Sequence, residues 1–315
     1  MISCLCRWNW VQTSRSGMLV PKTARTTWNI LFRPSDIRQA PPQAFVCFII
    51  AVSPCKRLSL ISHNVGRTCD MYDVTSTHLD LECSGVDTAV LPVGAIEQHG
   101  PHLPLSVDWF QGEIVAMQVA ERLDAFLLPG IPYGCSQAHT GFQGTISLAP
   151  ETLGAIVTDI AESLLEQGFR RIAVLNFHGG NLILKLAVRD LNLSQSIGKV
   201  VLVSPGQDAG PKLDDILDGY PDEQHAGELE TSVMLHVAPG QVGDSRVNHV
   251  PDVGPVYFDY LPMKEFCPDG VWGRSSLATA EKGRLVIEGM VDYTVDYLQD
   301  TFTSLGVPAQ NSSED

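Results

Sequence analysis

Although the chain has eight cysteines, no two of them are spaced as C-x-x-C. Zinc ribbons need such pairs, and disulfide frameworks belong to small, cysteine-dense chains, so we expect neither. Long apolar runs are also missing, since the apolar stretch 44–52 is too short to span a bilayer. We therefore expect reduced thiols, no membrane partner and a cytoplasmic location.

Basic residues are scarce after residue 70, where 12 Lys and Arg face 34 Asp and Glu. Such an acidic body argues against nucleic acid or an anionic membrane as a partner. Residues 1–70 are the opposite, with nine Lys and Arg against two acids. An Arg- and Ser-rich, acid-poor leader is typical of organelle transit peptides. We favour the alternative of an over-long gene start, with translation beginning at Met71.

From Met71 onward, apolar runs alternate with amphipathic stretches. Period-two and short apolar patterns predict strands, and helical periodicity predicts helices. The strands are expected at 87–93, 125–128, 145–148, 171–177 and 199–204, and the helices at 109–123, 151–167, 182–196 and 228–237. This alternation predicts an α/β fold with a mostly parallel sheet and helices on both faces. We expect one domain over 71–305 and a disordered tail over 306–315.

A first polar cluster, E-Q-H-G-P-H, directly follows the predicted strand 87–93 and includes Glu97, His99 and His102. Carboxylate and imidazole ligands suit zinc, manganese or iron. Asp108 follows, and it has two interpretations. With Gln111 it matches a helix capping box, whereas next to Glu97 and His99 a carboxylate bridging two cations fits better. We favour the bridge, and leave His102 open between ligation and a supporting role.

A second cluster, N-F-H-G-G-N, ends the predicted strand 171–177 and contains His178, Gly179, Gly180 and Asn181. The glycines allow a tight turn or a close approach of the backbone to a ligand. His-Gly-Gly after a strand also matches the oxyanion loop of α/β-hydrolase esterases. That interpretation fails because the sequence has no G-x-S-x-G nucleophile motif.

A third cluster, H-A-G-E-L-E-T, precedes the predicted helix 228–237. The helix dipole explains acids in a first turn, hence Glu228 and Glu230, but it disfavours a charged His225 there. We interpret His225 as a proton-transfer residue and Glu230 as a metal ligand. Glu228 is left open between general base, ligand and solvated acid. His139, in a Gly-flanked loop, either lines the pocket or is an ordinary loop histidine.

Taken together, these ordered motifs resemble the creatininase (creatinine amidohydrolase) family. The resemblance covers residues 88–290 and includes EQHGPHLPLSVD, GFQGTISL, NFHGGN, HAGELETS and LATAEKG. It implies a three-layer α/β/α domain and a homo-oligomer, often a hexamer. It also implies a two-metal site with ligands at Glu97, His99, Asp108 (bridging) and His178, a further carboxylate from the HAGELET segment, and His225 as the proton donor.

One departure from this resemblance concerns the substrate. Creatinine-cleaving members carry a glutamate where this chain has Gly180, and the aromatic residues that close over creatinine have no clear match. The chain is more similar to HGGN-type members, which include a deformylase, a peptidase and hydrolases of oxidised cyclitols. Creatinine is therefore not the substrate we expect.

The expected function is metal-dependent hydrolysis of a C–N amide-type bond in a small polar molecule. Two divalent ions (zinc, manganese or iron) would activate water, with His225 and Glu228 as catalytic residues. Hydrolysis of an oxidised cyclitol or keto-sugar, or peptidase activity, would use the same site. The non-enzymatic alternative is a metal-containing binding or assembly protein.

Overall fold

The computed structural model describes residues 10–12, 19–21, 71–194, 196–219 and 221–307. In the first of its two compact units, β1 (Trp10–Gln12) pairs antiparallel with β2 (Leu19–Pro21). The rest of the predicted leader, and residues 308–315 of the predicted tail, lie outside the described residues. No helix in the described part of the chain is long and apolar enough to cross a membrane.

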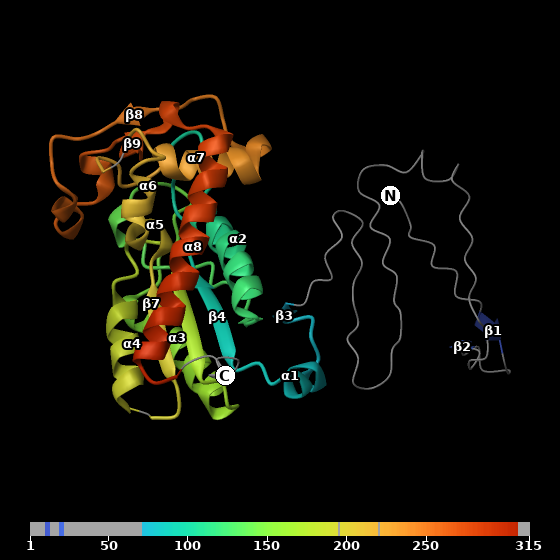
Figure 1. The fold of residues 1–315 in the computed structure, drawn as a ribbon. Helices are drawn as coiled ribbons and strands as arrows, with labels where there is room; N and C mark the ends of the chain where they lie inside the picture. The colour runs from blue at the N-terminus through green and yellow to red at the C-terminus, as the bar shows by residue number, and fades with distance from the viewer. Residues whose placement is uncertain (1–9, 13–18, 22–70, 195, 220, 308–315) are drawn as a thin grey trace. The chain divides into compact units, whose positions relative to one another are not determined.

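A five-stranded sheet forms the centre of the second unit (Figure 1). Its strands, in spatial order, are β3 (Tyr72–Asp73), β5 (Phe126–Leu127), β4 (Thr88–Val93), β6 (Arg171–Asn176) and β7 (Lys199–Val203). Every pairing in this sheet is parallel. The sheet confirms four of the predicted strands within one or two residues at each end.

The predicted strand 145–148 is wrong. Ile146 makes only an isolated bridge, donating its N–H to the carbonyl oxygen of Ile96 at 3.0 Å. The hydroxyl of Thr145 accepts the N–H of Gln98 at 3.0 Å. These bonds hold the segment 145–148 against the loop that follows β4. Because its partner is a loop and not a strand, the segment forms no ladder of hydrogen bonds.

Helices cover both faces of the sheet, as Figure 1 shows. Successive strand residues point to opposite faces, so Val90 packs in one core and Leu91 in the other. The first core includes α2 (Val107–Leu123) and α8 (Ala280–Ser304), and the second includes α3 (Pro150–Glu166) and α4 (Ile183–Ser194). The expected three-layer α/β/α arrangement is confirmed.

The predicted helices correspond to α2, α3, α4 and α7 (Glu228–Val237), the last with the bounds that the sequence indicates. The 25-residue α8 was not among the predicted elements, although its start is well capped. The Thr279 hydroxyl accepts the N–H of Lys282 at 3.1 Å, which satisfies one free donor of the first turn. α8 packs against α7 and α2 and so completes one outer layer.

Short elements make up the remaining connections. They are α1 (His78–Ser84), η2 (Gln137–His139), α5 (Pro205–Asp208), α6 (Gly210–Leu213), η3 (Pro239–Gln241), β8 (Asn248–His249), η4 (Pro255–Asp259), η5 (Met263–Glu265), β9 (Gly273–Arg274) and η6 (Ser275–Leu277). An aromatic cluster of Phe258, Phe266 and Trp272 holds the irregular segment together. Trp272 also bridges to His225, so this segment packs against the third polar cluster.

Candidate metal centre and active site

The loop after β4 brings the first cluster into the interior. Glu97 and His99 are both fully buried. The backbone passes very close to the start of α2 at Gly94, where an added Cβ would lie 2.6 Å from the Trp109 Cα. Only glycine allows this approach, which brings the loop beside Asp108. Asp108 is the second residue of α2. The N-cap of this helix is Ser106, so Asp108 does not cap it.

The turn after β6 is fixed by two asparagines. The Asn176 side chain accepts the N–H of His178 at 3.3 Å and donates to its carbonyl oxygen at 2.9 Å. Asn181 donates to Asn176 Oδ1 at 3.0 Å, and its own oxygen accepts the N–H of Cys135 at 2.8 Å. The Asn181 side chain therefore organises this turn as a scaffold residue.

His178 presents one ring nitrogen to the cluster. Its Nε2 lies 3.1 Å from the carbonyl oxygen of Cys135, which fixes the ring. Its Nδ1 lies 3.2 Å from Glu97 Oε1 and 3.3 Å from Asp108 Oδ2. Backbone contacts that orient a histidine in this way are common around metal ligands.

Gly180 stands where the chain leaves no room for a side chain. An added Cβ would lie 2.3 Å from the carbonyl oxygen of Cys135 and 2.5 Å from His178 Nε2. A glutamate at this position would therefore require a different backbone conformation. Besides Glu97 and Asp108, the cluster has a third carboxylate, and Glu230 of the third segment provides it.

Glu230 reaches the cluster from the first turn of α7. Its Oε2 accepts the N–H of Ala226 at 2.5 Å, and its Oε1 lies 3.6 Å from His99 Nε2. Ala226 has a φ of 51°, a left-handed conformation that is costly for a non-glycine residue. That conformation directs the Ala226 N–H at the carboxylate and thereby orients Glu230.

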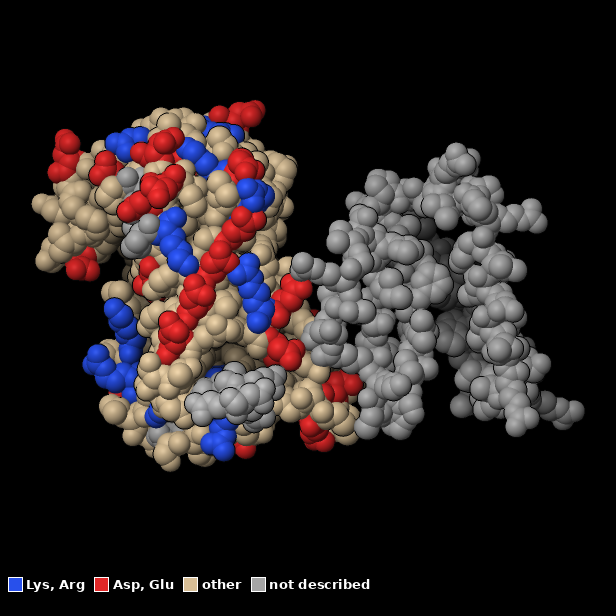
Figure 2. All heavy atoms as spheres, viewed as in Figure 1, with Lys and Arg blue, Asp and Glu red and all other residues tan. Residues whose placement is uncertain are grey.

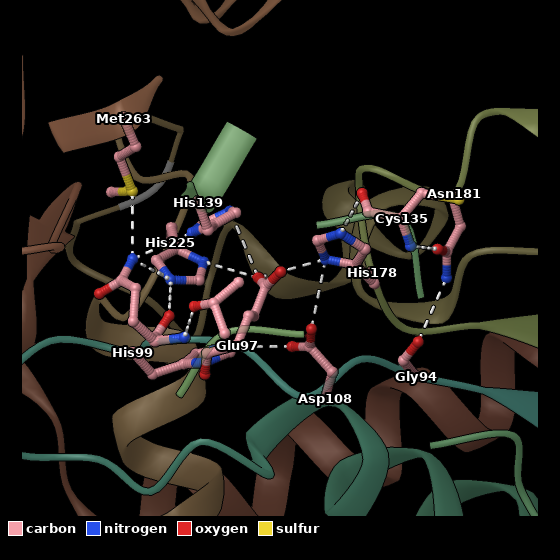
Figure 3. Close-up of polar contacts among 12 residues, drawn as sticks. Gly94, Glu97, His99, Asp108, Cys135, His139, His178, Asn181, His225 and Met263 are labelled. Atoms are coloured by element: carbon pink, nitrogen blue, oxygen red, sulfur yellow. Dashed lines mark hydrogen bonds and ion pairs between the residues drawn. The ribbon is translucent and has the colours of Figure 1, made fainter. Parts of the chain in front are cut away.

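Asp108 lies between two groups of candidate ligand atoms (Figure 3). Its Oδ1 is 3.1 Å from His99 Nε2, and His99 in turn faces Glu230. Its Oδ2 is on the side of His178, which in turn faces Glu97. One carboxylate thus contacts both groups, which is the arrangement expected of a ligand that bridges two ions.

The buried carboxylates of this cluster lack hydrogen-bond donors. Both oxygens of Glu97 and Oδ2 of Asp108 are inaccessible to solvent and accept no hydrogen bond. Unpaired buried charge is strongly unfavourable in a folded protein. Oxygen and nitrogen atoms that converge without donors fit divalent cations, and this donor set suits zinc, manganese or iron.

The electrostatics of the cluster keep these carboxylates ionised. Burial acts to raise the pKa of Glu97, but His178 and His139 outweigh it and lower that pKa well below its usual range. Burial likewise acts to lower the pKa of His99, but Asp108 and Glu230 raise it well above normal. A proton on His99 therefore offsets the charge of the carboxylates that face it, and a bound metal ion would replace that proton.

Two neutral imidazoles border the cluster. Burial lowers the pKa of His139 to about 3, and its Nε2 lies 3.3 Å from Glu97 Oε1. Burial and the nearby His99 also lower the pKa of His225. The His225 Nε2 donates to the carbonyl oxygen of Gln98 at 2.7 Å, which leaves Nδ1 facing Glu97 at 3.7 Å.

Gln98 contacts the site but was missed in the sequence. Its amide nitrogen lies 3.0 Å from His139 Nδ1 and 3.1 Å from His225 Nε2. The only local sign of a role for Gln98 was its position between Glu97 and His99. Side chains alternate in direction along an extended chain, so the Gln98 side chain is expected to point away from those of its two neighbours. His102 lies further out, with Nε2 2.9 Å from the Thr231 hydroxyl, and burial lowers its pKa to about 4.

The structure does not bring Glu228 to the cluster. Its carboxylate is fully buried but accepts the N–H of Gly219 at 2.6 Å and that of Asp218 at 3.2 Å, and it pairs with the Lys282 ammonium. Glu228 and Glu230 are two residues apart on α7, about 200° around the helix axis, so they point to different sides. We therefore propose a structural role for Glu228 in place of the catalytic role expected from the sequence.

A cavity of about 400 Å³ opens onto the cluster and gives access to Asp108, His178, His225 and Glu230. Gly179 also lines it, so the turn after β6 forms part of its wall. The remaining wall is formed mainly by polar side chains from α2, α5 and the segment before α7. A small molecule in this cavity would lie directly against the bridging carboxylate.

Comparison with known proteins shows several close similarities. A creatinine amidohydrolase of Pseudomonas putida is 36% identical over 234 residues, which cover 68% of this chain and 89% of that protein. A mycofactocin precursor peptide peptidase of Mycobacterium tuberculosis (strain CDC 1551 / Oshkosh) is 35% identical over 219 residues, 64% of this chain and 81% of the peptidase. Both alignments cover most of the relative's length.

Solved structures agree with these relatives. A mutant creatininase complexed with creatine has a TM-score of 0.65 and 32% sequence identity to this chain. The match covers 74% of this chain and 99% of the creatininase chain. A creatininase described as the manganese form scores 0.63 at 30% identity, with coverage of 74% and 99%. A mutant of Zn-Zn type scores 0.62 at 30% identity, with coverage of 73% and 98%. The family model described as creatininase (creatinine amidohydrolase) matches residues 73–298, and the chain belongs to this family of hydrolases.

Proposed function

We propose that this protein is a metal-dependent hydrolase that cleaves a C–N amide-type bond in a small polar substrate. The observation that carries the proposal is the set of buried carboxylate oxygens, on Glu97 and Asp108, that face imidazole nitrogens and accept no hydrogen bond. Solved relatives described as zinc and manganese forms support a divalent ion at such a donor set.

Two groups of residues would hold two divalent ions, which we propose to be zinc, manganese or iron. Glu97, His178 and Oδ2 of Asp108 form one group, and His99, Glu230 and Oδ1 of Asp108 form the other. Ions bound there would lower the pKa of water to about 7 and polarise a substrate carbonyl. Asp108 fixes the spacing between the two groups because it belongs to both.

Proton transfer is assigned to His225. Its Nε2–H donates to the Gln98 carbonyl oxygen, so the ring cannot rotate freely and Nδ1 faces the cluster. Burial lowers its pKa, which keeps the ring neutral near pH 7 and able to accept a proton. In the proposed reaction, Nδ1 takes a proton as water attacks and delivers it to the leaving nitrogen.

Substrate choice is where this chain departs from creatinine-cleaving members. Gly180 has no space for the glutamate that those members carry, and Glu230 supplies the carboxylate on the opposite side of Asp108. His139, Gly179 and Asn181 shape the site around His178, and His102 supports α7 through Thr231. We propose an amide substrate other than creatinine.

The decisive experiment pairs metal analysis of the purified protein with a substrate panel. The panel holds creatinine, formamides, lactams, short peptides and an oxidised cyclitol. We expect two divalent ions per chain, and turnover of a formamide or lactam that stops when the ions are removed and returns when they are restored. Stoichiometric metal without turnover of any compound would instead favour a binding protein.

Two further arms of the panel test other activities of the same site. A peptidase of Mycobacterium tuberculosis and a 3-dehydro-scyllo-inosose hydrolase of Thermotoga maritima are both similar to this chain. If peptides or the oxidised cyclitol are cleaved in preference, the proposed metal site would stand, but the proposed small amide substrate would be wrong. Full activity without metal would overturn the proposal itself.

We also propose a cytoplasmic homo-oligomer, in line with the hexamers implied by the family resemblance, that binds a small molecule and no nucleic acid. Leu182, Leu186 and Leu193 support association because they are 70%, 51% and 79% exposed on or beside α4. Figure 2 shows a diagonal band of acidic side chains along α8, which disfavours nucleic acid. Sedimentation equilibrium would test the assembly, and a monomer at micromolar concentration would contradict it.

A further inference from the structure

The wall of the cavity lacks cationic side chains. Among the described residues that line it there is no Lys or Arg, although acids and amides are frequent. Beyond the proposed metal ligands and His225, the wall includes Gln111, Gln207, Gln224, Glu223, Phe177 and Leu229. A ligand in the cavity therefore meets hydrogen-bonding amides, the apolar side chains of Phe177, Pro221 and Leu229, and one additional carboxyl group.

The nearby basic residues are engaged with acids outside the cavity. Lys282 pairs with Glu228 and Asp218, and Arg274 lies 3.5 Å from Asp222. Neither basic residue lines the cavity. An anionic group on a ligand would therefore find no lysine or arginine among the described wall residues.

Glu223 adds an acidic group to this wall. Its two oxygens accept the N–H groups of Glu228, at 2.5 Å, and Leu229, at 2.7 Å. It makes no ion pair with a basic side chain within the described part of the chain. In its ionised form Glu223 would repel an anionic substituent, and no lysine or arginine of the described wall would compensate that repulsion.

We propose that the substrate has no negative charge on the part that fills this cavity, and that a neutral polar group there is bound by the wall amides. This proposal rests on the proposed hydrolase function and narrows its substrate class. It excludes phosphorylated and carboxylated amides as preferred substrates. A neutral carboxamide or hydroxyl-bearing substituent matches the donors and acceptors of Gln207 and Gln224.

Three compounds that differ only in charge would test this proposal. Each carries the hydrolysable amide found by the panel and ends in a carboxamide, a carboxylate or a primary amine. We expect kcat/KM for the carboxamide to exceed that for the carboxylate at least about tenfold, and the amine to be accepted at least as well as the carboxylate. Equal or faster turnover of the carboxylate would overturn the proposal.

A charge introduced on the wall provides the second test. Gln207 lines the cavity on α5, has an exposed side chain and belongs to neither ligand group. Gln207→Lys should raise kcat/KM for the carboxylate compound about tenfold relative to the carboxamide. Gln299→Lys is the matched control because Gln299 is exposed on α8 and absent from the cavity wall, and it should leave the ratio unchanged.

Binding separates this proposal from the hydrolase function itself. Dissociation constants of the same three compounds would be measured calorimetrically with metal-loaded protein, whether or not they are hydrolysed. If the panel gives no turnover, the three compounds would be formamides that end in a carboxamide, a carboxylate or a primary amine. Weaker binding of the carboxylate, reversed by Gln207→Lys, supports the proposal even if turnover fails. Equal binding of all three, or no effect of Gln207→Lys on the ratio, contradicts the proposal even if hydrolysis is demonstrated.

Discussion

Two buried carboxylate regions lie close together in this molecule and differ in one respect. In the first, Glu97 and Asp108 are 0% and 2% exposed, and three of their oxygens accept no hydrogen bond. In the second, Glu228 is 0% exposed, yet Gly219, Asp218 and Lys282 provide donors to both of its oxygens. Both regions hold buried carboxylates, but imidazoles face those of the first region, whereas backbone N–H groups and a lysine face Glu228.

This difference teaches how to separate ligands from structural acids. A buried carboxylate with a full set of donors is already compensated and stabilises the fold around it. One without donors carries an electrostatic cost that a cation can remove. The comparison therefore supports the proposed metal binding by Glu97 and Asp108 and the proposed structural role of Glu228, and four predictions test these proposals.

The largest expected effect is that of Asp108→Asn compared with Glu228→Gln. Loss of the bridging charge should lower kcat on the order of 10³-fold and remove bound metal, because both ligand groups share Asp108. Glu228→Gln should retain metal and most activity at a temperature where it is folded. Metal content by mass spectrometry and kcat would be measured, and equal metal loss in both variants would break the distinction.

Metal removal is the second test, and it acts on the first region alone. A ligand that binds only the folded state at 1,000 times its Kd stabilises that state by about 4 kcal/mol. Chelation should therefore lower the melting temperature of the wild type, and Asp108→Asn should show little of this shift. An unchanged melting temperature after verified metal removal from the wild type would contradict a metal requirement for the cluster.

The third prediction acts on the second region alone. Lys282→Met leaves the buried Glu228 carboxylate without its cation and should lower the free energy of unfolding by about 3 kcal/mol. Denaturant unfolding would measure it, with the Lys282→Met, Glu228→Gln double variant as the control. The double variant should recover part of the loss, whereas additive losses would show that the pair is not coupled.

The sequence singled out Glu97, His99 and His178 of the proposed metal cluster because they follow β4 and β6, whose carboxyl ends meet at one edge of a parallel sheet. It could not separate Glu228 from Glu230. Which of the two faces the cluster depends on the orientation of α7. It also depends on Lys282, which pairs with Glu228 from 54 positions further along the chain. Long-range pairing of this kind leaves no local pattern.

Other parts of the fold were missed for similar reasons. The segment 145–148 has the composition of a strand, yet its backbone bonds to the loop after β4 and has no strand partner. Gln98 makes its contacts through residues 41, 127 and 165 positions away, so no spacing rule indicates its role. Local periodicity sets the element type, while tertiary contacts decide which polar groups meet.

The smallest predicted effect concerns Glu223, whose carboxylate is intermediate between the two regions because two backbone N–H groups are its donors. Burial raises its pKa to about 7, against an ordinary value near 4.5. The folded state therefore holds its proton more tightly, and this stabilisation is present at low pH and lost as pH rises through about 7.

Urea unfolding between pH 5 and pH 8 would detect this dependence. The free energy of unfolding of the wild type should fall with rising pH relative to that of Glu223→Gln, since the variant lacks the titrating group. The difference between the two proteins is the measured quantity, because the other titrating groups are common to both. Parallel profiles would show that the carboxyl group has its ordinary pKa in the folded protein.

The unequal exposure of the proposed ligand side chains has a consequence for ion exchange kinetics. The Glu230 side chain is 19% exposed, whereas Glu97 is 0% and Asp108 3% exposed. An ion held by His99 and Glu230 would therefore leave and return through the cavity much faster than one held by Glu97 and His178. Partial dialysis against a second metal should yield a mixed-metal protein with the original ion retained at the deeper position.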